Sequence, residues 1–180
     1  MGQRIGLFGG TFDPPHLGHL AVAIAARDAL ELDRTLLVVA NQPWQKVGHR
    51  PVTEARHRLS MTELLVQNSD GLEVSDLEIV RGGMSYTIDT VKQLQEAGHE
   101  VVLIMGADAA AGIDSWERAT ELSRLTRIAV VDRPGYDMPE LANWSVDKIP
   151  AQSISVSSSQ VRSSMSEGSP ATDNIPSAVR

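Results

Sequence analysis

The chain alternates short apolar segments with longer amphipathic ones, and this alternation limits the folds open to it more than any other feature. The apolar runs have the length of buried strands and occur at 4–8, 35–40, 72–75, 101–105, 127–131 and 154–156. Between them, apolar residues recur with helical spacing. Strands that alternate with helices are typical of βαβ units, in which each helix returns the chain to a parallel sheet. The sequence therefore predicts a doubly wound α/β domain with an open, mostly parallel sheet and helices on both faces.

Helices are predicted between these strands. In the first, apolar residues recur at i, i+3, i+4 and i+7 and form the face expected to pack on the sheet, namely Leu17, Leu20, Ala21 and Ile24. The second helix spans 53–68, with Thr53 as its N-cap. The third spans 88–97, with Thr87 capping its start and Gly98 ending it. A fourth helix is predicted to begin near Ser115 and to direct Leu122 and Leu125 inward.

The length of the chain suits one hydrophobic core. A chain of 180 residues needs neither a disulfide nor a metal ion to fold. The end of the chain is rich in Ser and Pro and has few large apolar residues. We therefore expect a domain at 1–165 and a flexible or loosely packed tail at 166–180.

Composition excludes several classes of protein. The sequence has no cysteine, which excludes disulfides, thiolate nucleophiles and zinc–thiolate or iron–sulfur sites. No window holds the roughly 18 apolar residues of a membrane span, and the first residues lead directly into a strand, so a cytoplasmic protein without a secretory signal is expected. The net charge of −7 disfavours nucleic-acid partners. An anionic substrate would therefore need positive groups gathered locally.

One strand-to-helix junction carries the clearest chemical signal. The first predicted strand continues into Gly9-Gly10-Thr11-Phe12-Asp13-Pro14-Pro15-His16-Leu17-Gly18-His19 and then into a helix. Adjacent glycines let the backbone approach a ligand closely. The following helix N-terminus offers free amides and a positive dipole end to a phosphate. The glycines match neither the G-x-x-x-x-G-K-[ST] nor the G-x-G-x-x-G phosphate loop.

The two histidines of this junction are the candidate charged contacts. His16 and His19 are three residues apart, so they share one helix face and can reach the same anion. The alternatives are the surface start of a helix or half of a metal site. A metal site would need a third ligand, and none stands nearby in the sequence. The coincidence of glycines, prolines and histidines favours phosphate binding.

The junction resembles the GGTFDPPHxGH motif of the HxGH nucleotidyltransferases, and its long form resembles that of the nicotinate-mononucleotide adenylyltransferases. Further motifs of that family follow in order, and they are Ser85-Tyr86-Thr87-Ile88-Asp89-Thr90, Gly106-Ala107-Asp108 followed by Trp116, Arg133-Pro134-Gly135, and Ser157-Ser158-Ser159-Gln160-Val161-Arg162. The resemblance implies a Rossmann-like fold and transfer of the adenylyl group of ATP to nicotinate mononucleotide. Two positions depart from the pattern. Gln45 replaces the histidine of a PPHK segment, and Ser159 replaces a threonine but keeps its hydroxyl.

The resemblance also implies roles for individual residues. The groups that stabilise the reacting phosphates are His16, His19, Lys46 and Arg162. The ATP contacts further include Gly9, Gly10, Thr11, Phe12, Gly106, Asp108, Ser157 and Ser158. The mononucleotide contacts are Tyr86, Thr87, Asp108, Trp116 and Arg133. We expect magnesium to be carried by the ATP phosphates, since Mg²⁺ prefers phosphate oxygens and water to a protein cage.

Several of these residues have ordinary structural explanations when each is taken alone. Lys46 follows the second strand and could be a surface lysine. Asp108 could cap a helix or a turn, and Trp116 could belong to the core. The segment 157–162 could be a capped helix start with a solvated arginine. Trp44 has no predicted role.

The implied chemistry agrees with the side chains that are present. A phosphate nucleophile is already ionised at neutral pH, so no general base is required, and the sequence shows no Ser-His-Asp arrangement. The partners expected are ATP and nicotinate mononucleotide, with neither nucleic acid nor a membrane, and a homo-oligomer stays open. The alternatives are a nicotinamide-mononucleotide or phosphopantetheine adenylyltransferase, or a nucleotide-binding module without catalysis. Pyrophosphate exchange that depends on the mononucleotide would separate an enzyme from a binding module.

Overall fold

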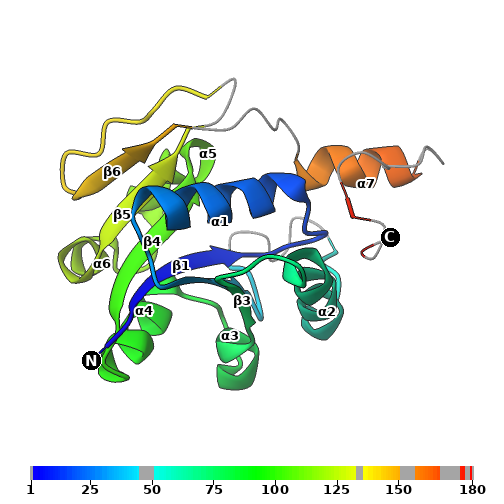
Figure 1. Ribbon diagram of the computed structural model, residues 1–180, viewed down its shortest axis with the longest axis horizontal. Helices are drawn as coiled ribbons and strands as arrows, with labels where there is room; N and C mark the ends of the chain where they lie inside the picture. Colours follow the sequence, from blue (N-terminus) through cyan, green and yellow to red (C-terminus); the bar gives the residue numbers. More distant parts are fainter. Residues whose placement is uncertain are drawn as a thin grey trace.

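A parallel sheet forms the centre of the molecule (Figure 1). The computed structural model describes residues 2–44, 51–132, 136–150, 157–166, 175–176 and 179. Its strands are β1 (Arg4–Gly10), β2 (Arg34–Val39), β3 (Leu72–Ser75), β4 (Glu100–Gly106), β5 (Arg127–Val131) and β6 (Val146–Ile149). Their order across the sheet is β3-β2-β1-β4-β5-β6, and each of these pairings is parallel. The predicted doubly wound, Rossmann-like fold is confirmed.

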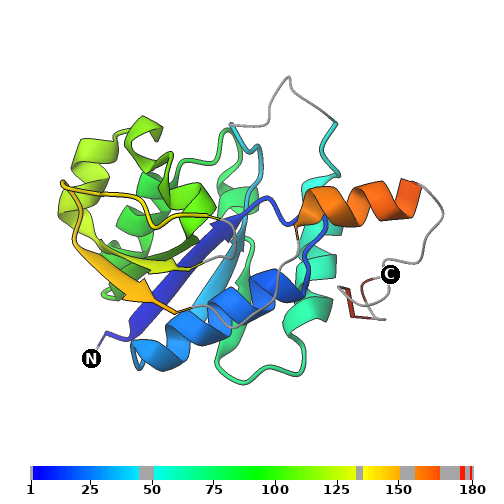
Figure 2. The same cartoon turned by 90° about the horizontal axis from the view of Figure 1, so that it is seen from above.

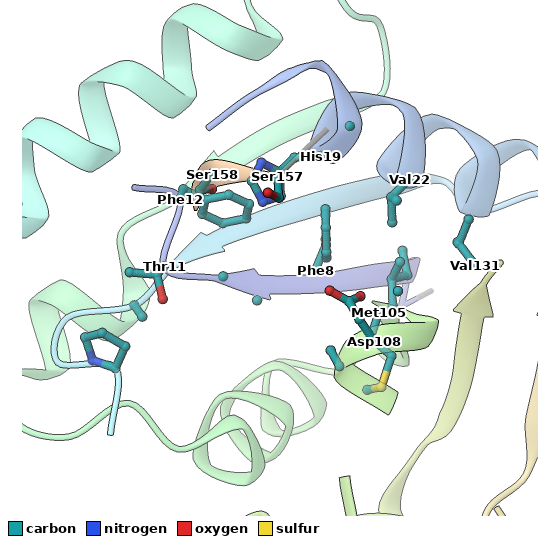
Figure 3. A pocket seen from close by; sticks show the side chains of 18 of the residues that line it. Phe8, Thr11, Phe12, His19, Val22, Met105, Asp108, Val131, Ser157 and Ser158 are labelled. Atoms are coloured by element: carbon teal, nitrogen blue, oxygen red, sulfur yellow. The ribbon is translucent and has the colours of Figure 1, made fainter. Parts of the chain in front are cut away.

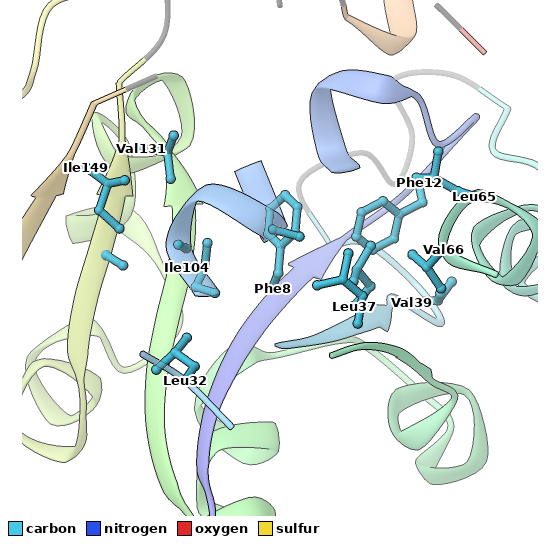
Figure 4. Packing of buried hydrophobic residues seen from close by; sticks show 14 of the residues in the cluster. Phe8, Phe12, Leu32, Leu37, Val39, Leu65, Val66, Ile104, Val131 and Ile149 are labelled. Carbon is cyan, nitrogen blue, oxygen red and sulfur yellow. The ribbon is translucent and has the colours of Figure 1, made fainter. Parts of the chain in front are cut away.

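Helices cover both faces of this sheet. They are α1 (Leu17–Ala29), α2 (Ala55–Val66), α3 (Leu77–Arg81), α4 (Thr87–Glu96), α5 (Ala107–Ala110), the 3₁₀ turn η1 (Ile113–Ser115), α6 (Ala119–Leu125) and α7 (Ser158–Ser166). Apolar residues of α1, α2 and α7 share one core cluster with one face of the strands (Figure 4). Residues of α4, α5 and α6 share a second cluster with the other face. The strands can serve both because successive side chains point to opposite faces, as Leu7 and Phe8 do.

The buried face of α1 differs from the predicted one. The predicted face is only partly buried, and its members are Leu17, Leu20, Ala21 and Ile24. The fully buried residues of the helix are Ala23 and Ala26. Small side chains at these two positions let the helix lie close to the strands, while the larger residues pack at its flanks.

Three helix starts also differ from prediction. α2 begins two residues after Thr53, which is therefore not its N-cap. Thr87 is the first residue of α4 rather than its cap, although Gly98 follows the helix end as expected, with φ of 89°. The helix expected from Ser115 begins later, because Arg118 adopts a left-handed conformation with φ of 52°. Such a residue cannot continue a right-handed helix.

Short or polar elements escaped prediction. α3 and α5 are single turns, too short to show a helical period. β6 has only Ile149 buried and carries Asp147 and Lys148, so it has no apolar run. It can be polar because it is an edge strand with a single neighbour. The strand predicted at 154–156 lies outside the described residues.

Part of the predicted tail belongs to the core. Ile175 and Val179 are 3% and 8% exposed and join the cluster that contains α1 and α7. These two residues do not fit a loosely packed tail. The boundary between residues 165 and 166 stays a prediction.

The sheet opens at the carboxyl ends of its two central strands. β1 and β4 are paired only as far as Leu7 and Leu103. Each then continues beside its other neighbour, β1 to the pair Gly10–Val39 and β4 to the pair Gly106–Val131. The strand order changes direction at this point, and such a switch point is where ligands of open α/β sheets bind. The topology therefore directs attention to the crevice between β1 and β4.

Candidate active site

A cavity of about 450 Å³ occupies this crevice. Its walls come from the ends of β1 and β4, the start of α1, the segment before α4 and the start of α7. Figure 3 shows His19 with Ser157 and Ser158 at one side, and Asp108 with Met105 at the other. Most of the predicted site residues line it, and these are Gly9, Gly10, Thr11, Phe12, His16, His19, Thr87, Gly106, Asp108, Trp116, Ser157, Ser158 and Arg162.

The end of β1 requires its two glycines for different reasons. A Cβ on Gly10 would lie 2.7–2.9 Å from three ring atoms of Phe12, which is too close for any larger residue. Phe12 is 2% exposed and has a positive φ of 49°, an uncommon conformation for an aromatic residue. Gly9 faces open space and lines the cavity, so its backbone is accessible to a ligand. We name residues 9–16 the phosphate loop, after the role that the sequence predicts for them.

The two histidines are stacked. The ring centroids of His16 and His19 are 3.7 Å apart with 27° between the planes. His16 is the N-cap residue of α1 and is 4% exposed. Its backbone N–H donates to Nδ1 of His19 at 3.1 Å. A neutral His19 with Nδ1 as acceptor carries its proton on Nε2, which is then a donor. The Phe12 and His19 rings pack edge to face, with 5.0 Å between their centroids and 75° between their planes, and this contact limits the rotation of the imidazole.

The start of α7 lies against the phosphate loop although about 145 residues separate them. The Ser158 hydroxyl donates to the carbonyl of Pro14 at 2.9 Å. Nη1 of Arg162 donates to the carbonyl of Asp13 at 2.5 Å, and Nη2 donates to the Ser159 hydroxyl at 3.0 Å. Figures 1 and 2 show α7 beside the N-terminal end of α1. The two predicted phosphate-binding segments therefore meet in one place.

The end of β4 forms the opposite wall. Gly106 is the N-cap residue of α5, and Asp108 stands in the first turn of that helix. Both line the cavity, together with Asp132 just beyond β5. This wall presents carboxylates, whereas the α1 and α7 side presents imidazoles and a guanidinium. The hydrogen-bond donors required by an anionic substrate are thus gathered at one end of the cavity.

The segment before α4 forms a third wall. Thr87 opens α4 and lines the cavity with Trp116, which stands just after η1. Trp116 also packs partly against the core cluster, as its structural interpretation expects, and its contact with the mononucleotide stays a prediction. Tyr86 is the N-cap residue of α4 and packs on that cluster without lining the cavity. A contact of Tyr86 with the mononucleotide stays a prediction.

Two predicted residues lie outside the described part of the chain, Lys46 and Arg133. Sequence reasoning also missed lining residues. Trp44 lines the cavity after β2, and Glu78 does so from α3. The tryptophan could have been noticed because large aromatics are scarce here, with three Trp in the chain. Nothing in the sequence marks Glu78, because it belongs to a helix that was not predicted. In the structure its carboxylate accepts a hydrogen bond from the Thr90 hydroxyl at 2.7 Å.

Two negative findings concern only the residues that the structure describes. Within those ranges no group of three or more His, Asp or Glu side chains is arranged to hold a metal ion. Within the same ranges no helix has the length and apolar character needed to cross a membrane. The cavity donors are imidazole, guanidinium, hydroxyl and backbone amide groups, which suit phosphate oxygens.

The open parallel sheet, the glycine loop and the paired histidines define a nucleotide-binding transferase site. The chain belongs to the cytidylyltransferase-like family, whose profile matches residues 7–164. Within it, the chain is 39% identical over 192 residues to the "Probable nicotinate-nucleotide adenylyltransferase" of Desulfitobacterium hafniense strain Y51, covering 99% of this chain and 91% of that one. It is 40% identical over 179 residues to a protein of the same name from Thermus thermophilus, covering 98% and 94%.

A solved structure shows the same fold. The nicotinic acid mononucleotide adenylyltransferase of Plasmodium falciparum, complexed with NaAD, superposes with a TM-score of 0.84 over 98% of this chain and 92% of that chain. The two sequences are 21% identical. At that identity the similarity establishes a shared architecture, and the assignment of side chains depends on the cavity described above.

Proposed function

We propose that this protein transfers the adenylyl group of ATP to nicotinate mononucleotide, giving nicotinate adenine dinucleotide and pyrophosphate. The curated relatives with this activity in their names are similar over nearly the whole chain. The single observation that carries the proposal is the meeting of the stacked histidines with the start of α7 across the phosphate loop. This arrangement concentrates donors around one anionic group, as adenylyl transfer requires.

The reaction needs positioning and charge stabilisation rather than proton transfer. A phosphate oxygen of the mononucleotide forms a bond to the α-phosphorus of ATP, and the bond from that phosphorus to the bridging oxygen breaks. The leaving pyrophosphate takes the electron pair. Because the nucleophile is already ionised, the enzyme has to align the two phosphates and stabilise the negative charge that builds up.

The ATP phosphates are assigned to the α1 and α7 side. His19 would donate from Nε2 to an oxygen of the transferred phosphate, with its ring held by His16 and Phe12. Arg162 and the backbone amide of Ser158 at the start of α7 would contact the departing pyrophosphate, since the Ser158 hydroxyl donates to Pro14, and we assign Lys46 to the same group from the family pattern. Mg²⁺ carried by the phosphates would add charge neutralisation when bound. Asp108 is assigned to a ribose hydroxyl at the other wall.

The mononucleotide is assigned to the wall at α4. The amides of Thr87 and Ile88 precede the first hydrogen bond of that helix, in which Asp89 donates to the Tyr86 carbonyl at 3.1 Å, and they stand at the positive end of its dipole. They can donate hydrogen bonds to the carboxylate of nicotinate, with Trp116 beside the ring and Thr87 at the helix start. Arg133 is assigned to this substrate by the family pattern alone. The amide of nicotinamide would bring its own donors against these donors, which is unfavourable.

The direct test is formation of nicotinate adenine dinucleotide from ATP and nicotinate mononucleotide, followed with labelled pyrophosphate in the reverse exchange. We expect exchange only when the mononucleotide is present. Binding of ATP without any exchange would instead identify a nucleotide-binding module. Exchange with phosphopantetheine in place of the mononucleotide would contradict the substrate assignment while keeping the transferase chemistry.

A further inference from the structure

Arg58 is the largest of the fully buried side chains in the described part of the molecule, and the chemistry above does not use it. It stands on α2 and is 1% exposed. Removing a charged guanidinium from water is unfavourable unless its donors are paired. The contacts of Arg58 therefore indicate what the buried charge is retained for.

The guanidinium donates to three backbone carbonyls from three separate segments. Nε donates to Thr53 at 2.7 Å, just before α2. Nη1 donates to Thr11 at 2.7 Å, in the phosphate loop. Nη2 donates to Asn41 at 3.1 Å, in the segment after β2. Because the guanidinium is planar and its donors have fixed directions, the three carbonyls are held in one mutual geometry.

Two of these segments line the cavity. Thr11 is itself a lining residue, next to Gly10 and Phe12. Asn41 leads directly to the lining residues Pro43 and Trp44. Arg58 thus joins two walls of the site without lining the cavity.

Asn41 extends the connection to the wall at α4. Its backbone N–H donates to the hydroxyl of Ser85 at 2.8 Å. Its side-chain amide donates to the carbonyl of Gly83 at 2.9 Å. Ser85 lines the cavity two residues before Thr87, where the mononucleotide is assigned. One buried side chain and one asparagine therefore connect the walls assigned to the two substrates.

We propose that Arg58 is a positioning residue that sets the phosphate loop in register with the segments at Asn41 and Ser85. The proposal rests on the proposed adenylyl transfer, because register between the two walls decides whether the two phosphates are aligned. In such a reaction a displacement of about 1 Å can cost on the order of 10²-fold in rate. Arg58 would therefore act on turnover more than on the affinity for either substrate.

The test compares Arg58→Lys with Arg56→Lys, a matched change at an exposed arginine of the same helix. Lysine keeps the charge but cannot present a planar fork to three carbonyls. We expect kcat of Arg58→Lys to fall by about 10²-fold, with the KM values for ATP and for nicotinate mononucleotide nearly unchanged. Amide hydrogen exchange should quicken in both 9–13 and 41–44. Arg56→Lys should match the wild type in each measurement.

Two results would overturn the proposal. One is a lowered Tm with wild-type kcat, which would make Arg58 a structural residue only. The other is an increase in the KM for ATP with an unchanged kcat, which would limit the effect of Arg58 to the wall assigned to ATP. Should Arg58→Lys fail to fold, Asn41→Ala gives the decision, because it leaves the guanidinium contacts in place and removes only the amide link to Gly83. We expect a smaller fall in kcat at unchanged KM, and an unchanged kcat would contradict the proposal.

The proposed function can fail separately. If the wild type makes no dinucleotide from nicotinate mononucleotide, the substrate assignment is wrong. Hydrogen exchange still decides whether Arg58 joins the two segments, since that measurement needs no substrate. Faster exchange in only one of the two segments would then overturn the inference.

Discussion

The two halves of the cavity are held in place by different kinds of contact. On the half assigned to ATP, the phosphate loop is fixed by buried groups, among them Phe12 at 2% and His16 at 4% exposure. On the half assigned to the mononucleotide, the apolar residues of α4 pack in the core, but the polar link from α4 to the residues after Trp116 is a surface ion pair. Arg118 donates to Asp89, and their side chains are 38% and 37% exposed.

This difference decides how sensitive each half should be to substitution. A donor in surroundings that exclude water interacts more strongly with a developing charge than the same donor in solvent. Half-exposed ion pairs are screened by water and salt and contribute little. We therefore expect large effects on the ATP half and small ones on the other. The predictions below test this order.

The largest effect is expected at His19. Replacing it with alanine removes a donor to the reacting phosphate, so His19→Ala should lower kcat by about 10²–10³-fold while the protein stays folded. His57→Ala, at an exposed histidine on α2, is the control. Turnover is measured by steady-state kinetics and the fold by circular dichroism. Near wild-type turnover in a folded His19→Ala protein would remove the basis for the assignment.

The next effect is expected at Arg162. Alanine there removes the guanidinium that is assigned to the departing pyrophosphate, together with its hydrogen bonds to Asp13 and Ser159. A hydrogen bond to a charged group contributes about 1.5–3 kcal/mol. The kcat/KM for ATP should therefore fall by about 10–100-fold, with a smaller loss in Arg162→Lys. Arg124→Ala, at an exposed arginine on α6, should leave it unchanged. A change in Tm alone would show that Arg162 only holds α7 in place.

A moderate effect is expected at the wall assigned to the mononucleotide. An unsatisfied buried donor costs about 1–3 kcal/mol, so kcat/KM should favour nicotinate over nicotinamide mononucleotide at least about tenfold. Thr87→Ala should keep this preference, because the donors are backbone amides. Trp116→Ala should weaken binding of both substrates by similar factors, since stacking does not depend on the ring substituent. Equal rates with the two mononucleotides would contradict this account of selectivity.

The smallest effect is expected at Glu121. A hydrogen bond from Lys92, at 2.5 Å, lowers the pKa of the Glu121 carboxyl from its ordinary value of 4.5, and the charges of Lys92 and Arg118 act in the same direction. When the pKa of a carboxyl is lower in the folded state than in the unfolded state, its charge stabilises the protein at pH values above the unfolded-state pKa. This stabilisation is lost as the pH falls through the folded-state pKa. Glu121→Gln should therefore lower Tm slightly at neutral pH.

The difference in Tm between Glu121→Gln and the wild type should disappear below pH 4.5 as the carboxyl becomes protonated. Thermal melts at several pH values check this. A difference that grows toward low pH would mean that Glu121 acts through something other than its charge. A large loss at neutral pH would contradict the comparison between the two halves.

The sequence by itself determined the fold class and many of the residues that line the cavity. Buried parallel strands are apolar on both faces, so β1, β2, β4 and β5 are visible as continuous apolar runs. The loop after β1 is visible because its glycines, prolines and histidines stand together in the chain. Such signals are local, and each depends on a few consecutive residues. Edge strand β6 and the single turns α3 and α5 lack such a signal and were missed.

Only the tertiary structure decided how separate segments meet. Arg162 reaches the carbonyl of Asp13 across 149 positions of the chain, and Arg58 reaches Thr11 across 47. Both arginines donate to backbone carbonyls, which every residue possesses, so no residue type in the sequence marks the acceptor. The burial of Ile175 in the core has the same origin. The chemistry of the side chains can be inferred from the sequence, because each residue type is known. Contacts to the backbone depend on which segments the folded sheet brings together.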